Sequence, residues 1–202
     1  MFDVLIIGGG AAGVSTALLL GSAVKKPYAE NKKIGIITHQ RASYLQTGIY
    51  NNVYGIKAGT LGSDLLRESL EQLTELYPHL EQIDKEKVTA ISKTDFGYLI
   101  TTNKNEYQTK IVVVAINSNS PMTIEGLEDY IIPHEKAAPS KNRIQLKNTE
   151  NLVTEGLYVA GTLAGCRSQL SIAAGSGANA AAEILTLWNN GEFAQVHDAI
   201  GK

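Results

Sequence analysis

The amino-acid sequence predicts an α/β fold with a parallel central sheet, and three observations indicate it. The chain opens with an apolar strand-like segment, a glycine-rich turn and an apolar helical segment, DVLIIGGGAAGVSTALLLG. A second apolar segment, IGIIT, follows a polar stretch and completes a predicted β-α-β unit. Towards the C-terminal end, GLYVAG predicts a last buried strand, and a long alanine-rich helix follows it.

The segments between these landmarks predict further elements. Leucines at helical spacing predict a helix from Gly62 to Leu76. KVTAISKT and GYLITTN predict a hairpin layer separate from the parallel sheet, to which KIVVVAIN returns. RASYLQTGIYNNVYGIKAGT predicts a long loop, whose aromatic content favours a functional role. The last helix is expected to end at Asn189, Asn190 and Gly191.

Composition limits the class of protein. A chain of 202 residues with 44% hydrophobic and 19% charged residues fits one globular domain. The net charge of -2 gives no support for a nucleic-acid partner. The single cysteine, Cys166, excludes an internal disulfide or dithiol motif and suits a reducing compartment.

The first apolar segment is not expected to be a signal peptide or a membrane anchor. Asp3 stands where a signal peptide has a basic leader. Three consecutive glycines interrupt an apolar run that is also short for a membrane span. We therefore expect a soluble, cytoplasmic protein without a membrane partner.

Gly8, Gly10 and Gly13 form the pattern G-x-G-x-x-G between the first strand and the first helix. The first glycine permits a tight turn, the second lets backbone approach a pyrophosphate, and the third lets helix and strand pack closely. The helix that follows, with Ala11 and Ala12 in its first turn, would present unpaired N–H groups to the phosphates. The motif predicts a bound dinucleotide, with a purely structural glycine turn as the alternative.

The end of the second strand leaves the kind of dinucleotide open. Thr38, His39, Gln40 and Arg41 stand there, without the acid that commonly binds the adenosine ribose. His39 and Arg41 could accept a 2′-phosphate, which would make the ligand NADP. Alternatively, Thr38 and backbone groups could contact the ribose of a different adenine dinucleotide, with His39 and Arg41 in a solvated loop.

Four segments of the chain form a larger pattern in a fixed order. They are DVLIIGGGAAGVSTALLL, NNVYGIKAGTLGSDLLRESLEQ, IVVVAINSNS and LVTEGLYVAGTLAGCRSQLSIAAGSGANAAAEI. Together they resemble the flavin domain of the thioredoxin-reductase-like pyridine nucleotide–disulfide oxidoreductases, over nearly the whole chain. The resemblance implies a Rossmann-like three-layer FAD/NAD(P)-binding domain with a small antiparallel β layer, an FAD cofactor, oxidoreductase activity and a homodimer.

The resemblance also implies which residues contact the flavin. Thr162 stands in place of the acid that holds the sugar-alcohol chain of the flavin, and Asn52 matches a loop residue that approaches the flavin. Ala115, Ile116 and Asn117 replace the Ala-Thr-Gly of the resembled family. Motif and resemblance together predict these cofactor-binding residues: Gly8, Gly10, Ala11, Ala12, Gly13, Thr38, His39, Arg41, Asn52, Val88, Ala115, Gly161, Thr162, Gln169 and Leu170.

The last helix contains two glycines, which are unfavourable in a helix interior. Gly175 and Gly177 each cost about 1 kcal/mol relative to alanine in a helix interior. We expect another backbone, such as the first helix, or the dinucleotide to come close to them. Gln169 lies at the helix start, where N–H groups could stabilise negative charge on a reduced flavin. Capping by Ser168 and packing of small residues is the alternative.

Two parts of the resembled family are missing from the sequence. Residues 117–151 number only about 35, and a β-α-β unit, which is only part of a dinucleotide-binding domain, alone needs roughly 30 or more. They also contain no second glycine motif, and one cysteine cannot form the family's redox dithiol. We therefore expect a single FAD-binding domain over residues 1–202, without a nicotinamide-binding domain between about 117 and 151.

The sequence offers only two candidates for catalysis, Cys166 and Tyr44. Cys166 precedes Arg167 at the start of the last helix, where a cation and a helix N-terminus lower a thiol pKa. Tyr44, like Tyr50 and Tyr54 of the long loop, could cover a flavin face or supply a proton. Inert packing is the alternative for each. The four histidines show no metal-ligand spacing, so no metal is expected.

The leading hypothesis is an FAD-binding flavoprotein oxidoreductase without disulfide reductase activity. Its electrons would come from free NAD(P)H, binding transiently, or from a partner protein. One alternative is a non-catalytic flavin or nucleotide sensor, or a redox partner module. Another is an NADP-binding reductase that uses Arg41 for the 2′-phosphate. The small-molecule or protein redox partner is not identified by the sequence.

Overall fold

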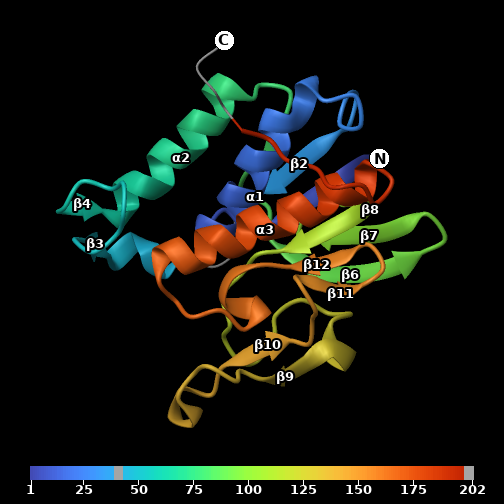
Figure 1. Cartoon of the computed structure of the whole chain (residues 1–202). Helices are drawn as coiled ribbons and strands as arrows, with labels where there is room; N and C mark the ends of the chain where they lie inside the picture. The colour runs from blue at the N-terminus through green and yellow to red at the C-terminus, as the bar shows by residue number, and fades with distance from the viewer. Residues whose placement is uncertain (39–42, 198–202) are drawn as a thin grey trace.

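The computed structural model describes residues 1–38 and 43–197, which fold around one mixed sheet with its main helices on one face (Figure 1). The path through this sheet has the strand order β11-β12-β8-β1-β2-β5. Its strands are β1 (Phe2–Ile7), β2 (Ile34–Ile37), β5 (Glu81–Ile83), β8 (Glu106–Val114), β11 (Leu152–Thr154) and β12 (Leu157–Val159). All neighbours on this path are parallel except β11 and β12, so the predicted α/β class is confirmed.

The parallel strands are covered on both faces, as their continuous apolar sequences predict. Side chains of β1 alternate between two hydrophobic clusters: Val4 and Ile6 join the helix-side cluster, and Leu5 and Ile7 join the cluster on the opposite face. All four side chains are fully buried. The central strands therefore hold a helix layer and a second β layer together, which gives the predicted three-layer arrangement.

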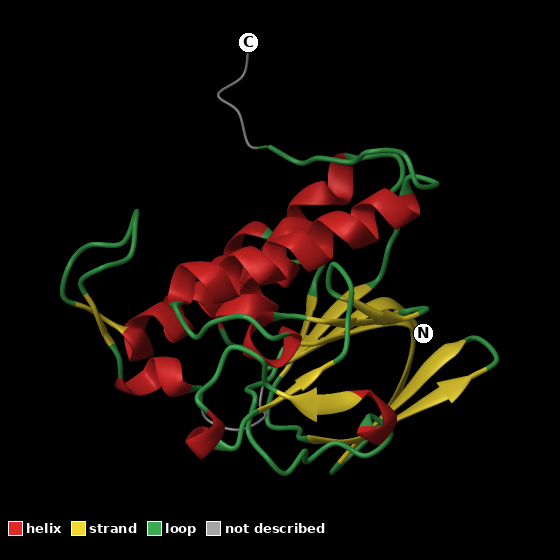
Figure 2. Ribbon diagram, turned by 60° about the horizontal axis from the view of Figure 1, so that its bottom comes forward, coloured by secondary structure: helices red, strands yellow, loops and turns green. Residues whose placement is uncertain are grey.

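Helices α1 (Ala11–Ser22) and α3 (Leu170–Trp188) lie together on the helix side of the sheet (Figure 2). A Cβ added to Gly177 of α3 would lie 2.0 Å from the backbone oxygen of Ala12, so the close approach expected there is confirmed. The Thr16 hydroxyl lies 2.9 Å from the carbonyl oxygens of both Ala12 and Gly177 and joins the two helices. At Gly175 no described backbone comes close, since a Cβ there would meet no described atom within 4 Å, so that part of the expectation is wrong and an approach of the dinucleotide stays a prediction.

Helix α3 ends where the sequence predicts. Asn189 follows its last residue, and Asn190 and Gly191 both adopt left-handed backbone conformations, with φ of 59° and 82°. The Gly191 N–H donates to the Thr186 carbonyl oxygen at 2.9 Å, which satisfies one of the otherwise unpaired carbonyls of the last turn.

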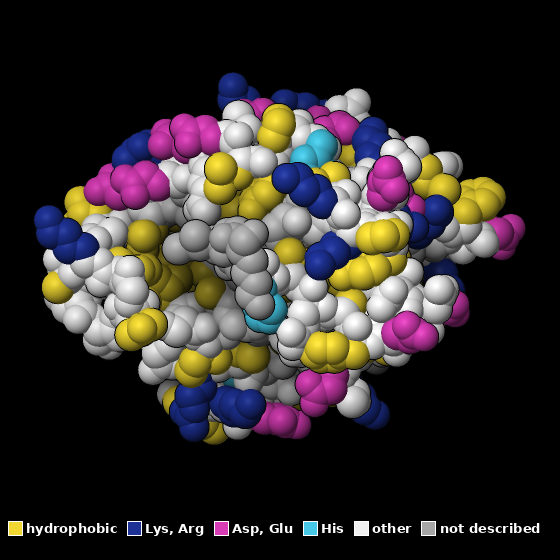
Figure 3. All heavy atoms as spheres, turned by 45° about the horizontal axis from the view of Figure 1, so that its top comes forward, with side chains coloured by type: hydrophobic (Ala, Val, Ile, Leu, Met, Phe, Trp, Pro, Cys, Tyr) yellow, Lys and Arg dark blue, Asp and Glu magenta, His cyan; other side chains and the backbone are white. Residues whose placement is uncertain are grey.

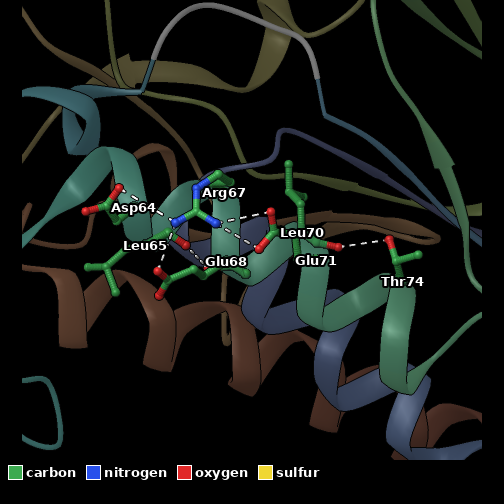
Figure 4. Close-up of polar contacts among 8 residues, drawn as sticks. Asp64, Leu65, Arg67, Glu68, Leu70, Glu71 and Thr74 are labelled. Carbon is green, nitrogen blue, oxygen red and sulfur yellow. Dashed lines mark hydrogen bonds and ion pairs between the residues drawn. The ribbon is translucent and has the colours of Figure 1, made fainter.

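Helix α2 (Gly62–Leu76) has the bounds predicted from its leucines. Its exposed face carries an ion-pair cluster centred on Arg67, shown in Figure 4. The guanidinium lies 2.9 Å from a carboxylate oxygen of Glu71, 3.0 Å from Glu68 and 3.8 Å from Asp64. The i,i+3 pair with Asp64 and the i,i+4 pair with Glu71 stabilise the helix, and the hydrogen bonds to Glu71, the largest effect, raise the pKa of Arg67.

The antiparallel layer consists of β6 (Val88–Thr94) and β7 (Gly97–Thr102). β7 pairs with the first part of β8, from Glu106 to Thr109, and the rest of β8 pairs with β1 and β12. The expectation of a layer separate from the parallel sheet is therefore wrong. β8 is one strand of nine residues that belongs to both layers.

Two small two-stranded sheets lie outside the central sheet. One pairs β3 (Ile49–Tyr50) with β4 (Thr60–Leu61), within the segment expected to be a long loop. The other pairs β9 (Ile131–Pro133) with β10 (Ile144–Leu146), within residues 117–151. In Figure 1 the β9–β10 sheet lies below the central sheet, on the side away from α2.

Within residues 1–38 and 43–197, no helix combines the length and apolar character that a membrane crossing requires.

Candidate cofactor-binding site

A cavity of about 1030 Å³ opens where β1, β8 and β12 end at their carboxyl sides. Its walls include residues 8–12 after β1, residues 115–119 after β8 and residues 160–162 after β12. Open α/β sheets bind their ligands at this edge, outside the carboxyl ends of the strands. Figure 3 shows one face of the molecule with a hollow in which hydrophobic side chains lie. Leu66 and Leu70 of α2 and Tyr50 contribute apolar surface to the cavity wall.

Two glycines of the opening motif are required by the fold itself. Gly8 has a φ of 115°, and a Cβ there would lie 2.5 Å from the backbone oxygen of Ala115. A Cβ on Gly13, which is buried, would lie 1.8 Å from the Gly8 carbonyl oxygen. Both positions therefore need glycine so that α1 can pack against the ends of β1 and β8. Gly13 does not line the cavity, but it contacts Gly8, which does.

Gly10 differs from these two because, among residues 1–38 and 43–197, no atom requires a glycine there. A Cβ on Gly10 would meet only the Ser43 hydroxyl oxygen, at an ordinary contact distance of 3.6 Å. Gly10 lies on the cavity wall as the N-cap of α1, no side chain in the described part of the chain caps this helix, and its first turn contains no acid. The bare N-terminus of α1 thus faces the cavity, as an anion-binding site requires.

The turn after β12 is held by α3. Gly161 has a φ of 73°, and its N–H donates to the Ser176 hydroxyl at 2.9 Å. Asn151 donates to the same hydroxyl oxygen at 3.0 Å and to the Val159 carbonyl at 2.8 Å. This buried network fixes the backbone that places Thr162 on the cavity wall.

The N-terminus of α3 is a second uncapped helix end at the cavity. Gln169 is the N-cap with an extended backbone, and no side-chain hydrogen bond caps the helix, so the alternative of capping by Ser168 is wrong. Gln169 and Leu170 both line the cavity. Cys166, which lies between Thr162 and Gln169 in the sequence, lines it as well. The Cys166 thiol is partly buried and free.

Most of the predicted cofactor-binding residues are brought together around this cavity. Those that line it are Gly8, Gly10, Ala11, Ala12, Thr38, Ala115, Gly161, Thr162, Gln169 and Leu170, together with the catalytic candidates Tyr44 and Cys166. Asn52 lies in an exposed bend after β3, outside the cavity wall, and Val88 is fully buried at the start of β6. Their roles in binding stay predictions. His39 and Arg41 lie outside the described residues, so the choice between the two readings of strand two stays open.

The sequence interpretation missed one group of cavity residues. Arg143, next to β10, donates to the Tyr44 hydroxyl at 3.3 Å and to the side-chain oxygen of Asn119. Its guanidinium carbon lies 5.1 Å from the centre of the Tyr44 ring. These contacts join the β9–β10 sheet to the 3-10 helix Tyr44–Thr47 across the cavity. The basic sequence HEKAAPSKNR was the only signal that could have indicated a role for this segment.

The cavity fits a dinucleotide cofactor. Its volume lies at the upper end of the range of about 300–1,000 Å³ that is usual for ligand and cofactor pockets. Two bare helix N-termini face it, and Gly10 leaves room for a ligand next to the backbone. Burial raises the pKa of Tyr50 in its wall, which keeps this phenol neutral. Fold and site together define an α/β dinucleotide-binding protein.

Comparison with known proteins names the family. Residues 2–176 match the family described as pyridine nucleotide-disulphide oxidoreductase, and the chain belongs to this family. The predicted family is confirmed by this match.

Curated relatives match part of the chain. A ferredoxin–NADP reductase from Levilactobacillus brevis is 30% identical over 131 residues, which covers 63% of this chain and 38% of that protein. A ferredoxin–NADP reductase from Pediococcus pentosaceus is 28% identical over 134 residues, covering 63% of this chain and 39% of that protein. The chain thus spans less than half the length of these relatives.

Solved structures share the fold. A thioredoxin reductase from Gloeobacter violaceus superimposes with a TM-score of 0.75 at 13% identity, covering 98% of this chain and 99% of that chain. A ferredoxin-flavin thioredoxin reductase from Clostridium acetobutylicum gives a TM-score of 0.67 at 15% identity, covering 94% and 98%. At these identities the likeness confirms the predicted Rossmann-like fold alone.

Proposed function

We propose that this chain binds FAD in the cavity and acts as an oxidoreductase. One observation carries the proposal: Gly10 lies on the cavity wall at the bare N-terminus of α1, where nothing in the described protein requires a glycine. A ligand phosphate that comes close to the Gly10 backbone explains why a glycine stands at this position. Membership of a family of pyridine nucleotide–disulphide oxidoreductases supports FAD as that ligand.

Different residues on the cavity wall would bind different parts of FAD. The N–H groups of Gly10, Ala11 and Ala12 would hold the pyrophosphate, and Thr38 would lie by the adenosine end. Thr162 would accept a hydrogen bond from the sugar-alcohol chain, and the N-terminus of α3 at Gln169 would stabilise negative charge on the flavin ring. When bound, FAD supplies the redox chemistry, and the protein supplies orientation and electrostatics.

We propose that the electrons come from NAD(P)H that binds transiently or from a redox partner protein, and that the chain does not reduce disulfides through a dithiol of its own. The single cysteine of the sequence supports the second part, because a dithiol needs two. The names of the curated relatives, ferredoxin–NADP reductases, support a nicotinamide nucleotide or a small redox protein as partner.

The organisation of the protein is part of the same proposal. Residues 1–202 would form one FAD-binding domain, in which residues 117–151 form the β9–β10 segment and not a second dinucleotide-binding domain. We further propose a cytoplasmic location, which the single cysteine suits, and a homodimer, which the family resemblance supports. Light scattering of the purified protein at several concentrations tests the dimer.

Gly10→Ala, measured beside the unaltered protein, tests FAD binding. The unaltered protein should show flavin absorbance when purified or after titration of the apoprotein with FAD. Gly10→Ala should keep a thermal midpoint close to that of the unaltered protein but lose about tenfold or more in FAD affinity, since its Cβ points at no described protein atom that must move. Gly13→Ala is the contrast, because its Cβ would collide with the Gly8 carbonyl and should lower the thermal midpoint.

Two results would overturn the proposal. An apoprotein that does not bind FAD would remove the cofactor, and a Gly10→Ala variant with unchanged FAD affinity would remove the observation on which the proposal rests. Anaerobic mixing with NADH or NADPH then tests the enzyme. Bleaching of the flavin absorbance supports an oxidoreductase, and a flavin that no donor bleaches would leave the protein a non-catalytic flavin-binding module.

A further inference from the structure

Five cations line the cavity, and no described carboxylate lines it with them. The cations are Lys87, Lys136, Lys141, Arg143 and Arg167. No Asp or Glu stands among the described lining residues, although the whole chain has a net charge of -2. Positive charge is therefore concentrated in the cavity, where charges of one sign in a cleft attract a counter-ion strongly.

These cations are also unpaired within the described part of the chain. The ion pairs found there involve Lys33, Arg67, Lys85 and Lys110, and none of the five lining cations. Glu135 lies in the same segment as Lys136 but does not line the cavity. The charge of the cavity is thus left for a ligand to neutralise.

Most of the charge comes from one structured loop, residues 134–143 between β9 and β10. The loop is tied down by backbone hydrogen bonds: the His134 N–H donates to the Arg143 carbonyl at 3.0 Å, and the Lys141 N–H donates to the Ala138 carbonyl at 2.9 Å. The Ile144 N–H donates to the Ser118 carbonyl at 3.0 Å and fixes the loop to the segment after β8. His134, Lys136, Lys141 and Arg143 therefore face the cavity from an ordered wall.

Arg143 is held in position by neutral groups and has donors left over for a phosphate. Its guanidinium lies over the Tyr44 ring, donates to the Tyr44 hydroxyl at 3.3 Å and bonds the side-chain oxygen of Asn119. These neutral partners use only part of its five N–H donors. An arginine stacked on an aromatic ring and without a carboxylate partner is well suited to bind phosphate.

The cations are not needed for the pyrophosphate of the proposed cofactor. That group is expected at Gly10, Ala11 and Ala12, where backbone N–H groups and the α1 dipole bind it without a charged side chain. The cations lie on other segments: Lys87 precedes β6, Arg167 follows the turn after β12, and the remainder belong to the β9–β10 loop. In Figure 1 the β9–β10 sheet and α1 lie on opposite sides of the central strands.

We propose that the β9–β10 loop and Arg167 form a second anion site, which binds the phosphate groups of a nicotinamide nucleotide beside the cofactor. The inference rests on the proposed function. It identifies the electron donor of the proposed oxidoreductase as a phosphate-bearing nucleotide that this chain itself binds. Cations that line one cavity together with the glycine-rich backbone favour a small anionic ligand that enters the cavity.

The test compares two matched double variants of the full chain. Lys136→Glu/Lys141→Glu reverses two exposed lining cations, and Lys26→Glu/Lys93→Glu makes the same charge change at exposed lysines outside the cavity wall. Binding of NADPH, NADH and inorganic pyrophosphate is measured by calorimetry at two salt concentrations, and FAD content is read from the absorbance spectrum.

The lining variant should bind NADPH about tenfold or more weakly than the unaltered protein, with a weaker salt dependence and an unchanged FAD content. The control variant should stay within about twofold, because its charges lie on the exposed surface outside the cavity wall and are screened. Loss of NADPH binding alone would assign the cations to the 2′-phosphate, and equal loss of NADPH, NADH and pyrophosphate would assign them to the pyrophosphate. Both results support the site.

Four results would overturn the inference. The first is an unaltered protein that binds none of the three probes, and the second is a lining variant that binds NADPH as well as the control does. Loss of FAD from the lining variant would assign the cations to the flavin cofactor. A variant with intact NADPH binding that transfers electrons to an acidic redox protein more slowly would make the cations a protein-docking surface. A colourless protein that still loses NADPH affinity on charge reversal refutes the proposed flavin but keeps this site.

Discussion

The Ser176 hydroxyl of α3 accepts a hydrogen bond from the Gly161 N–H at 2.9 Å, and this contact ties the last helix to the turn after β12. Ser176 is buried and accepts a second hydrogen bond from Asn151. A buried donor without a partner costs stability, because it lost its water on folding. The conformation of Gly161, with its φ of 73°, thus depends on a side chain fifteen residues along the chain.

Ser176→Ala should destabilise the protein by about 1–3 kcal/mol, since it leaves the Gly161 N–H and one Asn151 N–H without an acceptor. The free energy of unfolding in urea measures the change. Ser171→Ala is the control, because it makes the same substitution at an exposed position of the same helix and should change stability by less than about 0.5 kcal/mol. Equal effects of the two substitutions would contradict the role given to Ser176.

Gly177→Ala should destabilise the protein by about 1–3 kcal/mol, because its Cβ would lie 2.0 Å from the Ala12 carbonyl oxygen and force α1 and α3 apart. Gly175→Ala, two residues away on the same helix, meets no described atom and should instead stabilise the protein by about 0.5–1 kcal/mol through helix propensity. Thermal unfolding of both variants measures the two signs. Two shifts of the same sign would show that the helix crossing does not depend on Gly177.

The pair of glycines also shows what the sequence could and could not predict. Helical spacing placed both in one helix, but spacing does not say which face of the helix meets a neighbour. The opening motif predicted α1 and its position between β1 and β2, because glycine, strand and helix are adjacent in the chain and their geometry is local. The ends of α2 and α3 followed from local signals for the same reason.

Other features depend on contacts between distant parts of the chain. Arg143 reaches Tyr44 across 99 residues of sequence, so the joining of the β9–β10 loop to the cavity had no local signal. β8 belongs to two layers because its first residues, with polar side chains, pair with β7 while its apolar end pairs with β1. A hydrophobic pattern predicts a strand there but not its two partners. The sequence therefore predicted the glycines that line the site but not the cations of the β9–β10 loop that line it.

Glu86 should make stability depend on pH. Burial alone would raise its pKa, but hydrogen bonds from Thr102 at 2.8 Å, Asn105 at 2.7 Å and Tyr107 at 3.0 Å outweigh burial and lower the pKa below the ordinary 4.5. A carboxyl with a lowered folded pKa stabilises the protein above its unfolded pKa, and this contribution is lost as the pH falls through the folded value.

Glu86→Gln should therefore be less stable than the unaltered protein at pH 7, and the difference should shrink steadily below pH 4.5. Urea midpoints of both proteins between pH 7 and pH 3 measure it. Glu106→Gln, at an exposed glutamate next to Tyr107 in β8, is the control and should show a small difference at every pH. A gap between Glu86→Gln and the unaltered protein that stays constant with pH would argue against an ionised, hydrogen-bonded Glu86.

Thr162 makes the prediction that bears most directly on the cofactor. The side chain of Thr162 lies on the cavity wall, while its carbonyl accepts a hydrogen bond from the Gly165 N–H at 3.0 Å, so the turn is held by backbone atoms. Thr162→Asp can thus change the hydrogen-bond acceptor without removing the contact that shapes the turn. Hydrogen bonds to charged groups contribute about 1.5–3 kcal/mol and those between neutral groups about 0.5–1.5 kcal/mol.

Thr162→Asp should therefore tighten FAD binding about fivefold, which corresponds to a gain of roughly 1 kcal/mol. Titration of the apoprotein with FAD, followed by flavin fluorescence, measures the affinity. Thr162→Asn is the matched control, since it has the shape of Asp without its charge and should leave the affinity within about twofold of the unaltered protein. If Asp binds FAD no more tightly than Asn, the charge has no donor to meet, and the sugar-alcohol chain must be held by other groups of the cavity wall.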